Sequence, residues 1–399
     1  MKRVLQINIT CQHGSTGKIV ESIHNHLLKN RFESYVAYSA YDSNIKDAFK
    51  IESEFENFLR RGLNRLFGRK QSHSTLGTMR LIKNIKQINP DLIHIHNIQQ
   101  NSVNFIRLFQ FLKSYNRPVI YTLHDCWAFT GGCYHFTEIK CDKYQAGCQN
   151  CPLPRDKLDT QNRNASELYK LKESALRSLD HLEVVCVSHW LKAAASRSYM
   201  KNIPLSVINN GIDINVFKPI TGSIKKKLGI ENKFIILGAA NYWDERKGLR
   251  DFKELSKKID HKIVILLIGL NDDQREDLPK NIIGISRTEN KQELVELYSA
   301  ADIFINCSTE ETFGMVTAEA MACGTPAIVY DSTACPEIVD LNTGFIIKPH
   351  DINSINQAIQ AVMEKGKGYY SDHCRTRIIE NFLNEMMTEN YLQLYRKLI

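Results

Sequence analysis

Two glutamates beside a Phe-Gly turn are the residues of this chain whose types and spacing best suit chemistry. Glu311 precedes the turn Phe313-Gly314, and Glu319 follows it by about one helical turn. Glycine lets the backbone come close to a ligand, and the amides that begin a helix bind anions. A carboxylate can accept two hydroxyl protons, so one glutamate on each side of an anion site fits a diphosphate with a sugar at both ends. The spacing therefore predicts a nucleotide-sugar site.

The residues around these glutamates predict a strand, a turn and a helix. Residues 302–308 are apolar and β-branched, which is typical of a strand, and 315–323 are good helix formers. The first free N–H groups of that helix, at Met315, Val316 and Thr317, would form the anion site. The alternative is an ordinary amphipathic helix with two solvated glutamates.

This segment resembles the retaining glycosyltransferases of family 4, which have the GT-B fold. The matching residues are Glu311, Phe313, Gly314, Met315, Val316, Glu319 and Gly324 to Pro326. Further matches, in the same order as in the family, are Gly14 to Gly17, Pro90 to His96, Thr122 to Asp125, Val187 to Leu191, Ile208 to Asp213, Phe217, Pro219 and Arg246 to Gly248. The resemblance is nearest to the branch of bacterial colanic-acid and capsular polysaccharide enzymes. It implies an α/β protein of two doubly wound Rossmann-like domains that face a central cleft.

A chain of 399 residues is long enough for two domains, each with its own core. Short apolar runs alternate with helical patterns, which indicates parallel sheets covered by helices. The expected strands are 4–10, 35–40, 92–96, 119–124, 184–188, 205–209, 234–239, 262–268, 282–286, 303–307, 327–330 and 345–347. We expect an N-terminal acceptor-binding domain over 1–218 and a C-terminal nucleotide-sugar-binding domain over 219–380. By resemblance, 381–399 is a helix that returns to the first domain.

Composition argues against two classes of protein. The formal net charge of +8 is modest and no nucleic-acid-binding motif is present, so we expect no nucleic-acid partner. No apolar stretch is long enough to span a membrane, which predicts a cytoplasmic protein or one peripheral on the inner face of the cytoplasmic membrane. The eleven cysteines should then be thiols or metal ligands rather than disulfides.

Residues 54–70 predict a basic amphipathic helix, because their apolar side chains fall on one helical face and their arginines and lysine lie elsewhere. Such a helix either lies on an anionic membrane surface or packs on its own domain with the basic side chains in solvent. A polyprenyl-linked acceptor would favour the first. Both interpretations stay open.

Cations in the second half are candidates for neutralising the donor diphosphate. Arg246 and Lys247 follow an expected strand, and we give Lys247 the leading role. Members of the family often have a further arginine where this chain has Asn241, so one or two cations could bind the phosphates. Arg287 lies where the family seats the nucleotide base. The alternative for Arg246 and Lys247 is a solvated basic loop.

In the first half the candidates are Gly17 and His124. By resemblance, Gly17 lies beside the donor diphosphate and the acceptor, and His124 contacts the transferred sugar. Outside the family, a histidine at a strand end is more often a structural hydrogen-bonding residue. His94 and His96 alternate on one strand, but no third metal ligand lies near them in the sequence. We therefore interpret them as cleft or structural residues.

The chain contains no Asp-x-Asp motif, so a divalent-ion clamp has no obvious ligands. We expect a hexosyltransferase-type enzyme that needs no cofactor for catalysis, with His124, Glu311 and Lys247 as its catalytic residues. The family retains the anomeric configuration of the donor. No carboxylate is clearly placed as a nucleophile, so we favour front-face attack in which the leaving phosphate oxygen takes the acceptor proton.

After Cys126, four further cysteines follow His124 within 126–154, a segment rich in glycine and proline. They are Cys133, Cys141, Cys148 and Cys151, and the last two form the close-spaced pair that tetrahedral zinc sites use. Structural zinc would order this loop. Ordinary thiols stay open as the alternative, because the first two spacings are wider than in most zinc motifs.

The leading hypothesis is transfer of a sugar from a UDP- or GDP-linked donor to a glycan or polyprenyl-linked precursor of a capsule, O-antigen or exopolysaccharide. Two alternatives stay open. One is a nucleotide-sugar 2-epimerase on the same fold, and the other is a non-catalytic protein that holds a polysaccharide assembly. The presence of Glu311, Glu319, Lys247 and His124 argues against a non-catalytic protein.

Overall fold

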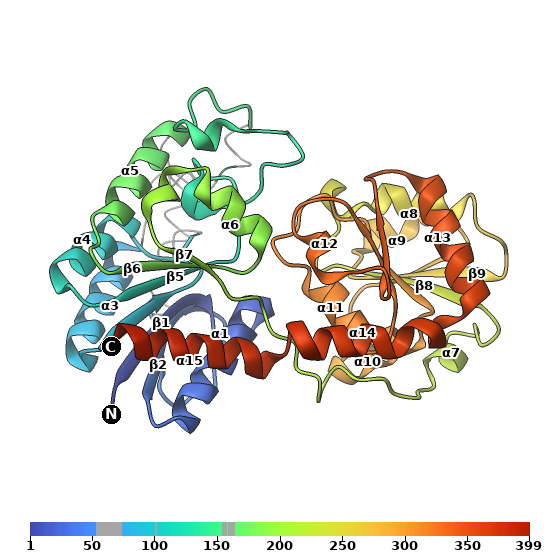
Figure 1. Cartoon of the computed structure of the whole chain (residues 1–399), viewed down its shortest axis with the longest axis horizontal. Helices are drawn as coiled ribbons and strands as arrows, with labels where there is room; N and C mark the ends of the chain where they lie inside the picture. Colours follow the sequence, from blue (N-terminus) through green and yellow to red (C-terminus); the bar gives the residue numbers. More distant parts are fainter. Residues whose placement is uncertain (53–73, 100–101, 154–157, 159–163) are drawn as a thin grey trace. The chain divides into compact units, whose positions relative to one another are not determined.

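The chain folds into two compact units, Met1–Asn209 with Met387–Ile399, and Asn210–Met386 (Figure 1). We call them unit 1 and unit 2. The computed structural model describes residues 1–52, 74–99, 102–153, 158 and 164–399. The sequence analysis placed the domain boundaries after residues 218 and 380, whereas the two units divide after Asn209 and Met386. The binding roles given to the two domains stay predictions.

Unit 1 is built on a seven-stranded parallel sheet with the order β3-β2-β1-β4-β5-β6-β7. Its strands are β1 Arg3–Thr10, β2 Glu33–Ala40, β3 Ala48–Lys50, β4 Leu92–Ile95, β5 Val119–Leu123, β6 Leu182–Cys186 and β7 Leu205–Val207. The chain moves outward from β1 to β2 and β3, then crosses back to β4. Parallel strands with right-handed crossovers therefore place the first helix on one face of the sheet and the following helices on the other.

The described helices of unit 1 cover both faces of its sheet (Figure 1). They are α1 Gly14–Lys29, α3 Thr75–Ile88, α4 Phe105–Tyr115, α5 Ala165–Arg177, α6 His189–Ser196, and the short η1 Trp127–Phe129, η2 Lys143–Gln145 and η4 Tyr199–Asn202. Asn104 caps α4 and Asn164 forms a capping box with Glu167 at the start of α5, so these two helices begin where their polar residues predict.

The last helix, α15 Asn384–Leu398, packs on the same face of the unit 1 sheet as α1. Met387, Tyr391, Leu392 and Tyr395 are buried there, together with residues of β1, β4, β5 and β6. Complete burial of an aliphatic side chain such as Leu392 contributes about 1.5–3 kcal/mol. The C-terminal segment therefore completes the core of unit 1.

Unit 2 is built on a six-stranded parallel sheet with the order β10-β9-β8-β11-β12-β13. Its strands are β8 Phe234–Ala239, β9 Ile263–Ile268, β10 Ile282–Ile285, β11 Ile303–Asn306, β12 Ala327–Tyr330 and β13 Gly344–Ile347. β9 is buried along its whole length, as strands covered on both faces are. The order reverses between β8 and β11, which are neighbours in the sheet.

Helices cover both faces of the unit 2 sheet (Figure 1). They are α7 Ile224–Lys227, η5 Glu245–Lys247, α8 Leu249–Ser256, α9 Asp272–Glu276, α10 Lys291–Ala300, α11 Met315–Ala322, α12 Cys335–Ile338, α13 Ile352–Lys365 and α14 Lys367–Asn381. In Figure 1, α8 and α13 lie on one side of the sheet, and α10, α11 and α14 lie on the other.

Each strand that the sequence predicts is present, with ends that differ by at most two residues. The sequence missed β3, a three-residue edge strand without the β-branched run that marks the others. The amphipathic segment 54–70 lies outside the described residues. Within the described part of the chain, no helix is long and apolar enough to cross a membrane.

Candidate active site

The reversal of strand order in unit 2 brings two predicted residues together. Lys247 ends η5, in the loop that leaves β8, and Glu311 lies in the loop that leaves β11. The carboxyl ends of parallel strands share one edge of a sheet, and ligands of such sheets bind where the strand order reverses. Lys247 and Glu311 therefore lie at the position in unit 2 where the fold itself predicts a ligand.

Lys247 and Glu311 form an ion pair in which the lysine Nζ donates to Oε1 of the glutamate. The two side chains are 25% and 17% exposed, so the pair is shielded from most of the solvent. The Glu311 N–H donates to Oγ1 of Thr333 over 2.9 Å, and the Lys247 N–H donates to Oδ1 of Asp244 over 3.2 Å. Both backbones are thus fixed. An ammonium group has three donors, and Glu311 takes one of them.

Arg246 is paired with carboxylates of unit 2. Its Nε and Nη2 atoms donate to Oδ2 of Asp244 over 3.0 and 2.6 Å, and Nη1 lies 3.8 Å from Oε2 of the buried Glu310. Two carboxylates beside one guanidinium already compensate its charge. Lys247, by contrast, has one carboxylate partner, Glu311, and its leading role stays a prediction.

The start of α11 has the geometry that its glycine predicts. Gly314 has a φ of 104°, and a methyl group there would lie 3.1 Å from Cδ1 of Ile338. No side chain caps the helix. The prediction of a free amide at Thr317 is wrong, because its N–H donates to the Gly314 carbonyl over 3.0 Å in the tight first turn. The predicted anion site is therefore reduced to Met315 and Val316.

Glu319 is half-buried and is held by a neighbouring helix. The hydroxyl of Tyr298, on α10, donates to its Oε2 over 3.1 Å. Burial, together with the Glu319 carboxylate, holds the pKa of Tyr298 well above its usual range, so this hydroxyl stays a donor. The contact fixes the orientation of the carboxylate.

Two other residues of unit 2 that the sequence predicts to bind the donor are Phe313 and Arg287, and their surroundings differ from those of Lys247, Glu311 and Glu319. The Phe313 ring is 3% exposed and packs edge-on to Phe382, with 5.6 Å between ring centroids, so its side chain supports the turn from inside. Arg287 is exposed, two residues beyond the edge strand β10. The strand order places it at the far edge of the sheet from β12 and β13.

In unit 1 the corresponding reversal lies between β1 and β4. Gly17 lies in the first turn of α1, which follows β1 and has no side-chain cap. A methyl group at Gly17 would lie 2.9 Å from Oγ1 of Thr10 and 3.1 Å from the N atom of Gln12. Glycine therefore lets the helix start pack closely on the loop before it.

His124 follows β5, one strand beyond β4. Its Nε2 lies 3.0 Å from Nδ1 of His96, and the two rings stack with 5.3 Å between centroids. Burial lowers the pKa of His124 to about 4. The pKa values of His94 and His96, both fully buried, are held well below the usual range by burial and by the neighbouring histidines. All three imidazoles are therefore neutral at physiological pH.

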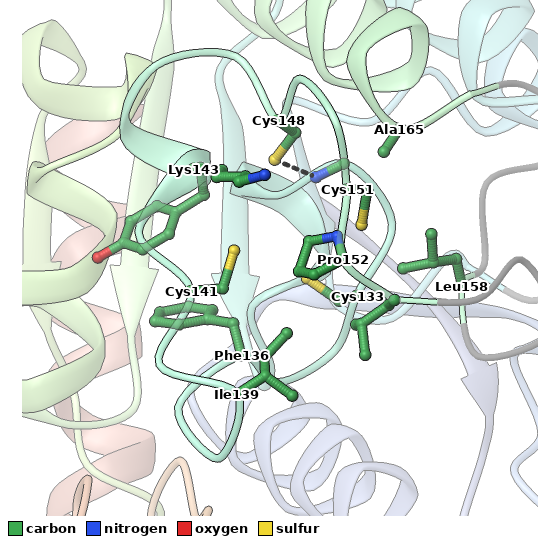
Figure 2. Close-up of a pocket in the computed structure, with 13 residues that line it drawn as sticks. Cys133, Phe136, Ile139, Cys141, Lys143, Cys148, Cys151, Pro152, Leu158 and Ala165 are labelled. Carbon is green, nitrogen blue, oxygen red and sulfur yellow. Dashed lines mark hydrogen bonds between the residues drawn. The ribbon is translucent and has the colours of Figure 1, made fainter.

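The four cysteines that the sequence predicts to bind zinc line one cavity of about 10 Å³ (Figure 2). This volume corresponds to room for about one water-sized particle. The Gly131 N–H donates to Sγ of Cys148 over 3.0 Å. Burial raises the pKa of Cys133 to about 11 and that of Cys148 to about 12, so both are thiols when no cation is bound.

In the part of the chain that the structure describes, no group of three or more His, Cys, Asp or Glu side chains is arranged to hold a metal ion. The four sulfur atoms share a cavity, yet they would have to close in on it to bind zinc. The zinc site therefore stays a prediction.

Comparison with known proteins identifies the family. Residues 16–216, half of the chain, match the profile described as Glycosyltransferase Family 4, and residues 221–381 match Glycosyl transferases group 1. The chain belongs to the family 4 glycosyltransferases. The resemblance that the glutamate motif predicted is confirmed.

Individual relatives of this glycosyltransferase are distant. The putative colanic acid biosynthesis glycosyl transferase WcaC of Escherichia coli is 21% identical, with 99% of this chain and 100% of the relative covered. The N,N'-diacetylbacillosaminyl-diphospho-undecaprenol alpha-1,3-N-acetylgalactosaminyltransferase of Campylobacter jejuni is 25% identical, with 51% of this chain and 59% of the relative covered. HepE of Anabaena, solved with UDP and glucose, superposes with a TM-score of 0.69 at 17% identity over both whole chains. The two Rossmann-like units of the predicted GT-B fold are confirmed.

Several residues that shape the site of this glycosyltransferase were missed at the sequence level. Three of them contact predicted residues that are distant in the chain, so no local pattern marks them. Thr333 contacts Glu311, Tyr298 contacts Glu319, and Glu310 lies beside Arg246. Asp244 could have been predicted from the sequence. It lies three residues before Lys247, which is the spacing of a side chain that caps a helical turn.

The neutral state of His124 makes a prediction about pH. Its pKa is about 4 in the folded protein and about 6.5 in an unfolded chain. The stability that it contributes is therefore complete above pH ~6.5 and is lost as the pH falls toward 4. In NMR spectra of protein labelled with 15N-histidine, the ring signals of His124 should not titrate between pH 5 and 8. The denatured protein is the control and should titrate near 6.5, whereas titration of His124 near 6.5 in the native protein would contradict the assignment.

Proposed function

We propose that this glycosyltransferase is a retaining, metal-independent enzyme that moves a sugar from a UDP- or GDP-linked donor to a precursor of a surface polysaccharide. The observation that carries the proposal is the Lys247–Glu311 ion pair where the strand order of unit 2 reverses, close in sequence to the start of α11. A cation, a carboxylate and helix amides are the groups that recognise a sugar diphosphate.

In unit 2, Lys247 and the amides of Met315 and Val316 would stabilise the charge on the leaving diphosphate. Glu311 would orient the lysine and accept a hydroxyl of the transferred sugar, while Glu319 would accept ribose hydroxyls. Tyr298 supports this last role, because it already fixes the Glu319 carboxylate. Arg246 would have to exchange Asp244 for a phosphate, and Arg287 and the backbone of Phe313 and Gly314 would contribute near the nucleotide.

The proposed chemical step conserves every atom of the donor and the acceptor. The bond between the anomeric carbon and the phosphate oxygen breaks, and the acceptor oxygen forms its bond from the same face. The acceptor proton passes to the leaving phosphate oxygen, so nucleoside diphosphate is released and the configuration is retained. No metal ion takes part, because Lys247 and the helix amides supply the charge stabilisation.

In unit 1, Gly17 and His124 would contribute to the donor and the acceptor. The uncapped start of α1 supports a contact of Gly17 with an anionic group. The neutral ring of His124 supports a hydrogen bond to a sugar hydroxyl rather than an ionic contact. The acceptor-binding role of unit 1 and the donor-binding role of unit 2 belong to the same proposal.

The class of acceptor is proposed from the names of relatives. One relative is named for colanic acid biosynthesis, and another is named for an undecaprenol-linked diphospho-sugar. A polyprenyl-linked oligosaccharide, which is built at a membrane surface, is consistent with both. Epimerisation of the donor and non-catalytic binding are the alternatives, and the same assay separates all three.

We also propose that Cys133, Cys141, Cys148 and Cys151 bind one structural zinc ion. The convergence of four thiols on one cavity supports the proposal, and so does the Gly131 N–H that donates to Cys148, because thiolates accept such bonds better than thiols. Zinc would displace the thiol protons and order the loop, with no part in the chemistry.

Replacement of Lys247 tests the proposed transfer. NMR of purified protein with 13C-labelled nucleotide sugars and a polyprenyl-linked acceptor should show a product with the anomeric configuration of the donor, also in EDTA. Lys247→Ala should lower the rate by about two to three orders of magnitude, as loss of one transition-state donor does. Lys253→Ala, which removes a surface ion pair with Asp277, is the matched control and should leave the rate unchanged.

Loss of activity in EDTA with recovery in magnesium or manganese would overturn the metal-independent mechanism. An epimerised donor would establish the epimerase instead. A folded protein that binds donors but neither transfers, hydrolyses nor epimerises them would identify the non-catalytic protein.

Replacement of Glu319 tests the ribose assignment. Glu319→Ala removes a charged acceptor and should weaken binding of UDP or GDP by about 1.5–3 kcal/mol, measured by titration calorimetry. Glu364→Ala, an exposed glutamate at the end of α13, is the control. Tyr298→Phe should weaken binding less, because the carboxylate remains but is less well oriented. Unchanged affinity in a folded Glu319→Ala protein would show that this residue does not bind the ribose.

The zinc proposal is tested by elemental analysis. Protein purified without added metal should contain about one zinc per chain, because four thiolates leave no open coordination position. Cys148→Ser or Cys151→Ser should release the zinc, and Cys186→Ser, a buried thiol on β6, should not. Absence of metal together with free reaction of all four thiols in the folded protein would rule the site out.

A further inference from the structure

Thr333, in unit 2, has a backbone conformation that its own side chain disfavours. Its φ is 49°, in the left-handed region. In the part of the chain that the structure describes, ten residues other than glycine have a positive φ, and Thr333 is the only one of them with a branched β-carbon. The β-carbon crowds the following carbonyl in this region, so a β-branched residue stays there only where the surrounding structure holds it.

The strained turn at Thr333 contacts the candidate active site. Oγ1 of Thr333 accepts the N–H of Glu311 over 2.9 Å, and the N–H of the next residue, Ala334, donates to the Glu311 carbonyl over 3.2 Å. The left-handed turn thus brings a side-chain hydroxyl and a backbone amide to one residue. Two consecutive residues after β12 therefore hold both backbone hydrogen-bonding groups of Glu311.

The residue before Thr333 extends these contacts toward Lys247. The Ser332 hydroxyl donates to the Thr309 carbonyl over 2.6 Å, and the Thr309 N–H donates to the Arg246 carbonyl over 2.9 Å. Arg246 precedes Lys247 directly in η5. Segment 332–334 therefore holds the loop that carries Glu311, and this loop in turn contacts the turn that carries Lys247.

The strain at Thr333 and the acceptor for Glu311 come from the same side chain. Glycine would adopt the left-handed turn without strain, yet it has no side-chain atom that could accept the Glu311 N–H. Valine has the branched β-carbon of threonine but no acceptor. A hydroxyl on the β-carbon therefore supplies a contact to Glu311 that the least strained residue for this turn cannot make.

We infer that Thr333 is a positioning residue for sugar transfer, whose hydroxyl fixes Glu311 against Lys247 and whose backbone strain is retained because this placement depends on the hydroxyl. The inference rests on the proposed role of Glu311 toward the transferred sugar. It separates two properties of one side chain. Stability should depend on the β-carbon, whereas turnover should depend on the hydroxyl, since a small displacement of a reacting group lowers the rate strongly.

Four replacements of Thr333 separate these properties. Thr333→Ser keeps the hydroxyl without the branch, Thr333→Val keeps the branch without the hydroxyl, and Thr333→Ala has neither. The kcat of Thr333→Ser should stay within about twofold of the native value, whereas Thr333→Val and Thr333→Ala should lose about ten- to a hundredfold, with the Kd of free UDP or GDP changed by less than about threefold. Thr376→Val, at an exposed threonine on α14, is the control and should leave kcat unchanged. Equal losses in Thr333→Ser and Thr333→Val would overturn the inference.

Thermal unfolding tests the strain. Thr333→Gly should unfold at a higher temperature than Thr333→Ala, because glycine alone adopts the left-handed turn freely. The order is the reverse of that at residues with a negative φ, where alanine is the more stabilising of the two. A Thr333→Gly protein that unfolds below Thr333→Ala would show that the backbone of Thr333 is not strained.

Amide hydrogen exchange, followed by NMR, tests the placement of Glu311 without substrate. The Glu311 N–H should exchange slowly in the native protein and in Thr333→Ser, and at least about tenfold faster in Thr333→Val, which removes its acceptor. Thr333→Ala serves the same comparison if Thr333→Val does not fold. Rapid exchange in the native protein, or native protection in either variant without the hydroxyl, would overturn the inference. Absence of any transfer by a native protein with the expected exchange pattern would instead overturn the proposed function.

Discussion

Lys247 and Glu311 are 64 residues apart in the chain, and they meet because the strand order of unit 2 reverses between β8 and β11. Two loops that leave adjacent parallel strands are forced to the same edge of the sheet. The other contacts of this site follow from that constraint. Asp244 fixes the turn that carries Lys247, and Thr333, after β12, fixes the backbone of Glu311. Helix α11 begins at Met315, a short way after Glu311 in the chain, which keeps the helix amides close in sequence to the pair.

Unit 1 places its candidate residues by a different physical means. Here neutral buried groups, rather than an ion pair, hold the residues in place. His94 and His96 are completely buried, and their pKa values are held well below the usual range. Neutral groups under such conditions must satisfy one another's hydrogen bonds, since an unpaired buried donor or acceptor is costly. The tyrosines of α15 complete this network through Tyr391 and Tyr395. The last helix is thus part of the interior that holds His124.

The sequence predicted those features that depend on local pattern. Alternation of β-branched runs with helical runs located the strands, and Gly314 marked a turn that its left-handed φ requires. The pairing of Lys247 with Glu311, the contact of Tyr298 with Glu319 and the contact of His96 with His124 could not be predicted, because they depend on strand order and on helix packing. The prediction of a free amide at Thr317 was wrong for a local reason, because this N–H donates to the Gly314 carbonyl in the tight first turn of α11.

The central claim is that Lys247 and Glu311 act as one unit in sugar transfer, and a double-mutant cycle tests it most directly. Turnover would be measured for the native protein, Lys247→Ala, Glu311→Ala and the double variant, with thermal unfolding as a check on folding. If the ion pair is the functional unit, the double variant should be no slower than the slower single variant. Independent roles would multiply the two losses, and that result, in folded proteins, would contradict the account.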